Sequence, residues 1–356
     1  MKILLAGAFA SDPSVYTYAT SFLRALIGQG HNVIPYNTRP TGFIRFAPPA
    51  YHDYAFIHTA QKFRPELIFL IKAENISAHT LRTIKHHIRC KIINFYTDNP
   101  FTLWNHNSKA TVLERLPELD CFLSWSHMLI TPLHAAGCSH VCHFPFAYDE
   151  TIFNQPITIT EEEHKKYTAD VCFVGTWEPE REYWLAALHA ALPNMKLAIW
   201  GNQWEKQSTD IHLKECVRGP AVYHQTLIKI FRSSKIVLNF IRIQNVGSHN
   251  MRTFEVPASS TFLLTQRTQE QACEYFKEEE SVACFGNLEE LVNKVTLYLG
   301  HEERRAHIRQ QGYQRAQEFT LSRQLQKYFT ACPVFSGTRI GTWNAAPSST
   351  SSPILK

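Results

Sequence analysis

Residues 169–181 read ADVCFVGTWEPER, which predicts a β-strand, a turn that contains a glycine, and the start of a helix. Backbone N–H groups and the helix dipole at such a junction favour a diphosphate group, and Arg181 adds a fixed positive charge. Tight turns between a strand and a helix need a glycine in any case. Gly175 and Thr176 in this turn are therefore candidate phosphate-binding residues mainly because Arg181 follows them.

Strands and helices alternate in both directions from this unit, as in parallel sheets with crossover helices. Before residue 150, the predicted strands are 2–9, 33–36, 67–71, 91–96, 121–125 and 140–144, and the predicted helices are 15–27, 77–89 and 126–136. After residue 168, the predicted strands are 169–174, 197–200, 236–240, 261–265 and 282–285, and the predicted helices are 181–192, 223–232, 287–299 and 302–329. The fold class is therefore α/β, with two Rossmann-like domains.

The chain has 356 residues, which is too long for one ordinary α/β domain and suits two. Hydrophobic periodicity lapses in a polar interval, so we predict a first domain at 1–150, a linker at 151–168 and a second domain at 169–331. Residues 332–356 are rich in Ser and Pro and are predicted to be a disordered tail.

The formal net charge is +5 without a block of consecutive Lys or Arg, which suits an anionic ligand and does not call for a nucleic acid partner. The first apolar run stops at Ser11 and reads as a strand, and no window approaches the ~18 apolar residues of a spanning helix. A cytoplasmic protein is expected. Helix 77–89 is basic, which leaves a weak peripheral membrane contact open, although a solvated outer face is the favoured interpretation.

The nine cysteines suit reduced, buried thiols better than a disulfide framework. One group of zinc-ligand residue types stands close together in the sequence: His134, Cys138, His140, Cys142 and His143. No second cluster with metal-ligand spacing accompanies it, and residues 141–144 read as a strand. No metal site is predicted.

A second candidate site follows the strand at 236–240. Asn239 to Arg242 end that strand with polar and cationic groups, and SHNMRTFEVPA at 248–258 predicts a helix that starts near Asn250. Cations and amides there could bind phosphates, while Glu255 could accept hydrogen bonds from two ribose hydroxyls. An ion pair between Arg252 and Glu255 at i,i+3 spacing explains the same residues equally well.

The run from Asn250 to Leu264 resembles the signature of the CgeB-like (spore-maturation) glycosyltransferases, relatives of the large retaining GT-B family. Further similar motifs stand in the same order over roughly residues 1–329: Tyr96 to Asp98, Phe144 to Asp149, Phe173 to Gly175 with Arg181, Trp200 to Asn202 with Trp204, and Ser234 to Asn239. The resemblance implies a GT-B fold, in which two Rossmann-like domains with parallel sheets face each other across a cleft. It also implies a nucleotide-sugar donor, such as a UDP- or GDP-sugar, held by the second domain.

Carried over by motif, the resemblance gives each candidate residue a role. Glu255 would hold the ribose, and Gly201, followed by Asn202, would lie close to the base. The groups at the diphosphate or the donor sugar would be Gly175, Thr176, Arg181, Arg242, Asn250, Arg252 and Thr253. One departure is Gly247, which stands where many relatives have a second carboxylate, so Asn250 or Arg242 would contact the sugar instead.

We predict a retaining, metal-independent hexosyltransferase-like enzyme that uses no cofactor, because cationic side chains such as Arg252 can stabilise the leaving diphosphate and no Asp-x-Asp metal motif is present. The acceptor, which could be a glycan, a protein or a small molecule, would lie on the first domain. Asp98 could orient that acceptor or act as a base, although an Asx-turn before Pro100 is slightly favoured. The alternatives are a catalytically degenerate GT-B-like binding protein and another two-Rossmann enzyme such as an epimerase. A dehydrogenase is disfavoured because no G-x-G-x-x-G turn follows the first strand.

Overall fold

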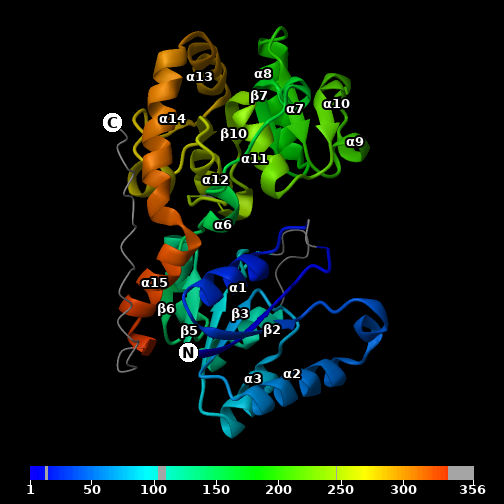
Figure 1. The fold of residues 1–356 in the computed structure, drawn as a ribbon, viewed down its shortest axis with the longest axis vertical. Coiled ribbons are helices and arrows are strands. Elements are labelled where there is room, and N and C mark those ends of the chain that lie inside the picture. The colour runs from blue at the N-terminus through cyan, green and yellow to red at the C-terminus, as the bar shows by residue number, and fades with distance from the viewer. Residues whose placement is uncertain (13–14, 103–109, 246, 336–356) are drawn as a thin grey trace, which may run out of the picture.

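The computed structural model describes residues 1–12, 15–102, 110–245 and 247–335, and it contains two parallel six-stranded sheets (Figure 1). The first sheet has the order β2-β1-β3-β4-β5-β6, with strands Lys2–Gly7 (β1), Asn32–Asn37 (β2), Leu67–Ile71 (β3), Lys91–Phe95 (β4), Cys121–Ser124 (β5) and Val141–His143 (β6). The second has the order β12-β11-β10-β7-β8-β9, with strands Ala169–Val174 (β7), Leu197–Trp200 (β8), Val217–Gly219 (β9), Ser234–Asn239 (β10), Leu263–Gln266 (β11) and Ala283–Phe285 (β12). The predicted α/β class with two Rossmann-like sheets is confirmed.

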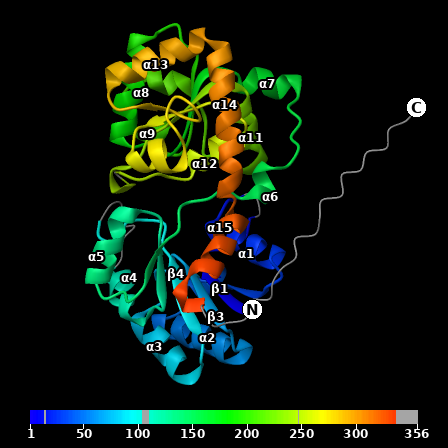
Figure 2. The same cartoon turned by 90° about the vertical axis from the view of Figure 1, so that its left-hand side faces the viewer.

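Helices cover both faces of each sheet (Figures 1 and 2). Before β7 the α-helices are Tyr18–Gly28 (α1), Pro49–Phe63 (α2), Ala78–His87 (α3), Ala110–Glu114 (α4), Ile130–Ala135 (α5), Glu150–Phe153 (α6) and Glu161–Tyr167 (α7). After it they are Pro179–Ala191 (α8), Trp204–Gln207 (α9), Ile211–Cys216 (α10), His224–Arg232 (α11), Arg252–Ala258 (α12), Leu288–Gly300 (α13), Glu302–Ala316 (α14) and Leu321–Ala331 (α15). A π-helix, Glu270–Tyr275 (η6), follows β11.

The central strands are mostly apolar and buried, which explains why their positions could be predicted. All five residues of β3 are buried, as are five of the six residues of β7. Strands covered on both faces need apolar side chains on both, so their sequences do not alternate. β9 is different because it is three residues long and half-exposed at a sheet edge, and the sequence pattern missed it.

The polar interval at 151–168 holds two short helices. Thr160 and Glu163 form a reciprocal capping box at the start of α7, in which each side chain accepts from the other residue's backbone N–H. The capping box explains how this polar segment, which lacks a hydrophobic stripe, forms a helix.

The single helix predicted over 302–329 is wrong. Thr320 adopts an extended conformation (ψ 149°) and caps α15, so the chain turns between α14 and α15. Backbone hydrogen bonds run from the Tyr148 N–H to Phe319 (3.2 Å) and from the Leu321 N–H to Tyr148 (2.9 Å). They join this turn to the segment in which the chain first passes from the first domain to the second. α15 then packs beside α1 on the first domain, as Figure 2 shows, although the sequence assigned it to the second.

The predicted disordered tail begins within ordered structure. Residues Pro333–Phe335 form a turn of 3-10 helix, and the side chains of Cys332 and Phe335 are buried. The rest of that prediction, residues 336–356, lies outside the described residues.

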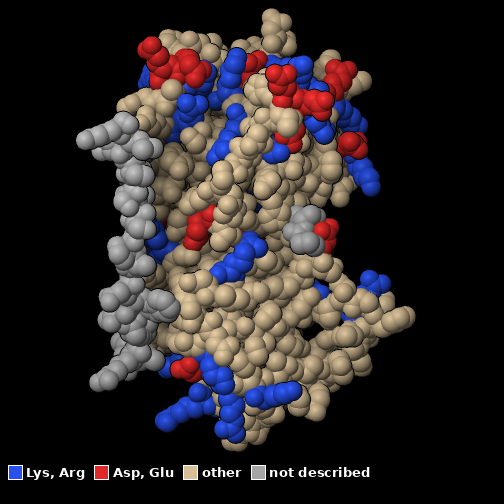
Figure 3. All heavy atoms as spheres, viewed as in Figure 1, with Lys and Arg blue, Asp and Glu red and all other residues tan. Residues whose placement is uncertain are grey.

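Basic side chains gather at the free end of the first domain, around α3 (Figure 3). On this helix Leu81 and Ile84 are buried, while Arg82 is exposed and forms an ion pair with Glu118. Lys85 forms an ion pair with Asp120 at 3.1 Å. α3 is therefore an amphipathic helix with a solvated cationic face. Within the described residues, none of the helices is long and apolar enough to cross a bilayer.

Candidate active site

The strand order of each sheet reverses at one point, and a cavity lies at each reversal. In the second sheet the reversal falls between β7 and β10, and in the first between β1 and β3. Open α/β sheets bind ligands outside the carboxyl ends of the strands at such switch points. A cavity of about 310 Å³, here called the cleft cavity, is lined by residues after β7 and β10 together with Thr97, Asp98 and Phe146 of the first domain. A second cavity of about 270 Å³, the first-domain cavity, is lined by Ala8 after β1 and residues 71–75 after β3.

The turn after β7 forms one wall of the cleft cavity. Gly175 and Thr176 both line it. The Gly175 backbone is fixed from two sides, because its N–H donates to the Trp200 carbonyl at 2.9 Å and its carbonyl accepts from Trp204 Nε1 at 2.8 Å. A Cβ on Gly201 would lie 1.9 Å from the Gly175 carbonyl oxygen, so Gly201 allows the two backbones to approach.

Three guanidinium groups converge on the cleft cavity: Arg181, Arg242 and Arg252 all line it. Glu178 forms ion pairs with two of them, at 3.3 Å to Arg181 Nε and at 2.7 Å to Arg242 Nε. Burial lowers the pKa of Arg181 to about 10; Glu178 opposes this shift, and the like charges of Arg242 and Arg252 add to it. The cations therefore repel one another and favour an anion that lies between them.

Arg252 is oriented by the residues around it. Its guanidinium forms an ion pair with Glu255, and its backbone N–H donates to Asn250 Oδ1 at 3.0 Å. Glu255 is 3% exposed and is not among the residues that line the cavity. The ion pair between these two residues is thus present in the structure, with Glu255 buried and Arg252 partly exposed to the cavity.

Asn250 joins α12 to the end of β10. Its Nδ2 donates to Asn239 Oδ1 at 2.9 Å and to the Phe240 carbonyl at 3.2 Å, while its Oδ1 accepts from Arg252. Both the nitrogen and the oxygen of the Asn250 side-chain amide therefore form hydrogen bonds within the protein. The helix begins at Arg252, two residues later than predicted.

Besides Glu255, three more predicted donor-binding residues do not line the cleft cavity. Thr253 is fully buried and its hydroxyl donates to Gln271 Oε1 at 2.7 Å. Gly201 lies behind Gly175. Asn202 accepts through its carbonyl from Trp177 N–H at 2.9 Å and through Oδ1 from Ala221 N–H at 3.2 Å. These residues support the turn after β7 and the start of α12.

Asp98 faces the arginines from the first domain. Its Oδ2 accepts from Lys72 Nζ at 2.5 Å and its Oδ1 accepts from Gln244 Nε2 at 3.2 Å, and the side chain is nearly buried. Lys72 lines the first-domain cavity and Asp98 lines the cleft cavity, so their ion pair stands between the two. Tyr18 lines both cavities, and its buried hydroxyl has no hydrogen-bond partner among the described residues.

The sequence prediction missed Lys72, Gln244 and Glu178. Lys72 and Ala73 both have positive φ (56° and 48°), which places them in a conformation that non-glycine residues rarely adopt. Such strain is concentrated at binding sites, but neither residue type signals it in a sequence. Glu178 could have been suspected, because it directly precedes the proline that starts α8 in the turn already singled out.

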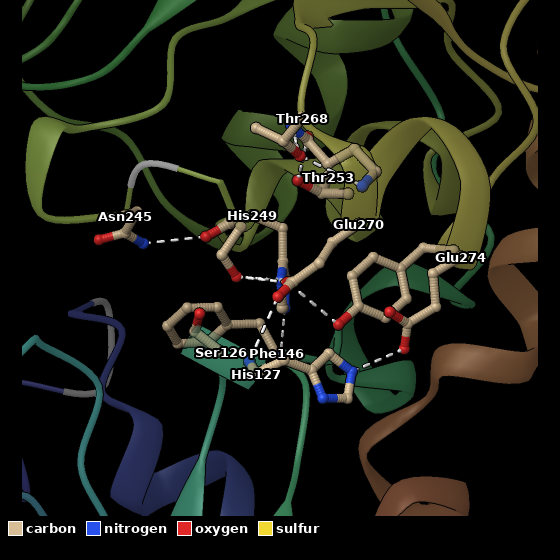
Figure 4. A network of polar contacts seen from close by, with 12 residues as sticks. Ser126, His127, Phe146, Asn245, His249, Thr253, Thr268, Glu270 and Glu274 are labelled. Atoms are coloured by element: carbon tan, nitrogen blue, oxygen red, sulfur yellow. Dashed lines mark hydrogen bonds and ion pairs between the residues drawn. The ribbon is translucent and has the colours of Figure 1, made fainter. Parts of the chain in front are cut away.

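A buried polar network holds the loop after β10 against the first domain (Figure 4). His249 accepts at Nε2 from the Phe146 N–H (3.0 Å), and its Nδ1 lies 3.0 Å from Glu270 Oε2. Because Nε2 accepts from a backbone N–H, the ring carries its proton on Nδ1. Burial lowers the pKa of His249. Ser248 also donates to Glu270, and His127 N–H donates to it from the first domain at 3.3 Å.

The same network extends from Glu270 to the surface through η6. His127 Nε2 lies 3.2 Å from Glu274 Oε1, and the Tyr275 hydroxyl lies 3.1 Å from His143 Nε2. Gly247, the position that lacks a carboxylate, lies beside this network with φ +84°, a conformation that disfavours any side chain. The sequence prediction missed this network because its members come from four separate segments, around residues 127, 143–146, 248–249 and 270–275.

Comparison with known proteins supports the architecture. The model of a family described as "Glycosyl transferase-like" matches residues 181–330, and no curated protein matches the chain by sequence. The structure is similar to a sucrose-phosphate synthase from Thermosynechococcus elongatus, with a TM-score of 0.67 and 13% identity over 94% of this chain and 100% of that chain. It is also similar to Anabaena HepE in complex with UDP and glucose, with a TM-score of 0.63 and 13% identity over 93% and 98% of the two chains.

A third similar structure is an alpha-glucosyltransferase in complex with UDP and a DNA 13-mer, with a TM-score of 0.63 and 11% identity over 93% of this chain and 98% of that chain. At sequence identities this low, the structural similarity shows a shared fold and nothing more specific. The predicted GT-B architecture is thereby confirmed, whereas the resemblance to the CgeB-like group stays a prediction. The chain has the GT-B fold, and residues 181–330, most of its second domain, match the glycosyl transferase-like family.

Proposed function

We propose that this chain is a glycosyltransferase that binds a nucleotide-sugar in the cleft cavity and transfers the sugar to an acceptor on the first domain. One observation carries the proposal: Arg181, Arg242 and Arg252 converge at the switch point of the second sheet and face Asp98 of the first domain across one cavity. A diphosphate is the anion that suits several guanidinium groups and a glycine turn at once.

A UDP-sugar is the first donor to test. Two structurally similar proteins are described with UDP in their complexes, one of them together with glucose. The turn at Gly175 and Thr176 would meet the diphosphate, with Arg181 and Arg252 as its cationic partners. Glu255 would accept from the ribose once the nucleotide competes for Arg252.

The acceptor would enter through the first-domain cavity. Lys72 and Glu74 line this cavity, and Arg39, also in its lining, forms an ion pair with Glu74 at 3.0 Å. Tyr18 stands where the two cavities meet. A polar acceptor that carries hydroxyl groups fits such a lining, and its reacting hydroxyl would lie near Asp98.

In the proposed reaction the bond between the anomeric carbon and the diphosphate oxygen breaks, and a bond to the acceptor oxygen forms. Arg181, Arg242 and Arg252 would stabilise the charge that develops on the leaving diphosphate, so the reaction would not need a metal ion. Asp98 would orient the acceptor hydroxyl or take up its proton, held in place by Lys72 and Gln244. Retention of the anomeric configuration is part of the proposal and is tested by NMR of the first-formed product.

A thermal-shift screen with UDP-, GDP-, ADP- and CDP-sugars tests donor binding, because a ligand that binds only the native state raises the melting temperature. We expect one nucleotide to stabilise the chain and Glu255→Ala to remove most of the shift. Binding without any hydrolysis or transfer would favour the degenerate binding protein, for which Gly247 in place of a carboxylate is the argument. No shift with any nucleotide, together with no transfer, would refute the proposed function.

A further inference from the structure

Three cysteines that are distant in sequence meet on one face of the first sheet. Cys121 lies on β5, Cys142 on β6 and Cys332 directly after α15, and their sulfur atoms all lie within 4.8 Å of one another. Cys142 Sγ and Cys332 Sγ are 3.6 Å apart. Cys142 pairs with Leu123 across the two strands, two residues after Cys121, so both thiols point to the same face.

This spacing matches what a single metal ion requires. With a Zn–S bond of about 2.3 Å, sulfurs that share one ion lie about 3.8 Å apart. Cys121 is fully buried, Cys332 is 4% exposed, and Cys142 is half-buried on the edge strand. The face they share is covered by α15, so no backbone movement is needed to bring the three sulfurs together.

A fourth polar group points at the cluster without a partner. The hydroxyl of Tyr328 is buried with no hydrogen-bond partner among the described residues, and its side chain is 6% exposed. An orphaned hydroxyl in an apolar site is costly, and a thiolate beside it would accept its hydrogen bond.

The cluster is accessible from the surface. A cavity of about 400 Å³ is lined by Cys142, Tyr328 and Cys332, and Arg315 and Lys327 line it as well. Glu274 and Glu318 line the cavity too, and Glu318 forms an ion pair with Arg315.

We propose that Cys121, Cys142 and Cys332 bind one thiophilic d¹⁰ metal ion through three thiolates, with Tyr328 donating a hydrogen bond to one of the sulfurs. Each sulfur that binds the ion releases its proton to water, so no oxidant or reductant takes part. The ion would be Zn²⁺ with a water as its fourth ligand, or Cu⁺ in three-coordinate geometry. It would fasten the end of α15 to β5 and β6, next to the point where the chain returns from the second domain.

This site is not the one that the sequence brought into consideration. Of that group, only Cys142 takes part, while His134 Nδ1 lies 2.9 Å from the Cys138 carbonyl oxygen. His143 points to the other face of β6, towards His127 and Glu274. The proposed site also lies outside the cleft cavity, so it is independent of the proposed glycosyl transfer.

The test uses the untagged full-length chain, reduced and stripped of metal with a chelator. It is dialysed against Zn²⁺ and, separately, against Cu⁺ under anaerobic conditions, and the bound metal is counted. We expect one ion per chain, sulfur-to-metal charge-transfer absorption when Co²⁺ replaces Zn²⁺, and joint protection of Cys121, Cys142 and Cys332 from alkylation. A competing chelator is then added to each metal-loaded sample, and the ion that the chain retains is identified as its metal.

Cys142→Ser should lose the ion, whereas Cys273→Ser, which alters an exposed cysteine, should keep it. Tyr328→Phe should keep the ion with an affinity about 10-fold lower, as is typical when a hydrogen bond to a metal ligand is removed. If Cys142→Ser fails to fold, alkylation of the parent chain with and without metal still tests the proposal, because it shows which cysteines the ion protects. No stoichiometric ion with either metal, protection of other cysteines, or a Cys142–Cys332 disulfide in place of metal binding would overturn the proposal.

Discussion

Gln244 Nε2 donates a hydrogen bond to Asp98 Oδ1 at 3.2 Å, and this contact joins the loop after β10 to the carboxyl end of the first sheet. The two residues are 146 positions apart and belong to different domains. Because Lys72 holds the other carboxylate oxygen at 2.5 Å, Asp98 is fixed between the two cavities. A carboxylate held in this way suits a role in positioning or activating the acceptor.

Asp98→Asn is expected to lower kcat by about 10²–10⁴-fold, the range for loss of a general base, with donor affinity nearly unchanged. Steady-state transfer assays, or donor hydrolysis if the acceptor is not found, give the rate, and calorimetry gives the affinity. Asp53→Asn, which alters an acid of the first domain outside the cleft cavity, is the control for the substitution itself. Unchanged kcat in Asp98→Asn would assign Asp98 to a structural role.

Gln244→Ala tests the contact between the domains. The amide contacts Asp98 but carries no charge, so we expect a loss in kcat of about 10-fold, corresponding to about 1.4 kcal/mol for one hydrogen bond to a charged group. In the background of Asp98→Asn the same substitution should have little further effect. Additive losses in the double variant would show that Gln244 acts independently of Asp98.

Arg252 and Glu255 should be energetically coupled in nucleotide binding. Arg252→Ala is expected to weaken binding by about 1.5–3 kcal/mol, or roughly 10- to 150-fold, as for a hydrogen bond to a charged group. Binding of UDP and of inorganic pyrophosphate by the single and double variants separates two roles for Glu255. If Glu255 holds the ribose, Glu255→Ala weakens UDP and spares pyrophosphate; if it only orients Arg252, both weaken equally. Arg304→Ala, on the surface of α14, should leave both affinities unchanged.

Glu182 supports the turn after β7 and should stabilise the fold above pH 4. Burial disfavours its charge, but hydrogen bonds from Trp177, Asp210, Thr209 and Ser208 prevail and lower its pKa to about 2. The unfolded value is about 4.3, so the stabilisation is complete above that pH and is lost as the pH falls towards 2.

Glu182→Gln should therefore lower the free energy of unfolding at pH 7 by about 1–3 kcal/mol, with a difference that shrinks below pH 4. Urea unfolding at pH 7, 4 and 3 measures this. Glu180→Gln, an exposed residue in the same helical turn, is the matched control and should change stability by less than about 0.5 kcal/mol. A pH-independent difference between Glu182→Gln and the parent chain would contradict the assignment.

His143 should make the fold less stable in mild acid. Burial, together with His127 and His249, lowers the pKa of His143 to about 4, whereas an unfolded histidine titrates near pH 6.5. Between these values the unfolded chain takes up a proton that the folded chain refuses, so stability falls as the pH falls from about 6.5 to 4. The slope from one such group is at most about 1.4 kcal/mol per pH unit.

His143→Gln should flatten this dependence, and the exposed His140→Gln should not. Unfolding curves at pH 7, 6 and 5 give the slopes. Equal slopes in the parent chain and His143→Gln would show that His143 is not buried against the second domain in solution.

The buried strands and the turn after β7 could be predicted because their signals are local. Uninterrupted apolar runs mark β3 and β7, and Gly175 with Arg181 marks the turn. The break between α14 and α15 was missed because it depends on backbone hydrogen bonds that join Phe319 and Leu321 to Tyr148, which lies far earlier in the chain.

The candidate site was predicted only in part, because some of its residues have local sequence signals and others meet only through the fold. Arg181, Arg242 and Arg252 lie in segments with recognisable strand ends, so sequence placed them together. Asp98 was correctly noticed at the end of a strand, but nothing in its neighbourhood revealed Lys72 or Gln244, which meet it only through the fold. Asn250 and Thr253 were assigned to the ligand through the resemblance. Asn250 lines the cleft cavity and also holds α12 to the second sheet, whereas Thr253 is buried and bonds to η6.

The most direct measurement is a crystal structure of the chain with a UDP-sugar, or with whichever nucleotide stabilises it in the thermal screen. We predict that the diphosphate lies in the cleft cavity within hydrogen-bond distance of Arg181 and Arg252, with the sugar turned towards Asp98. A nucleotide bound elsewhere, with those two guanidinium groups still facing only Glu178 and Glu255, would contradict the proposed donor site.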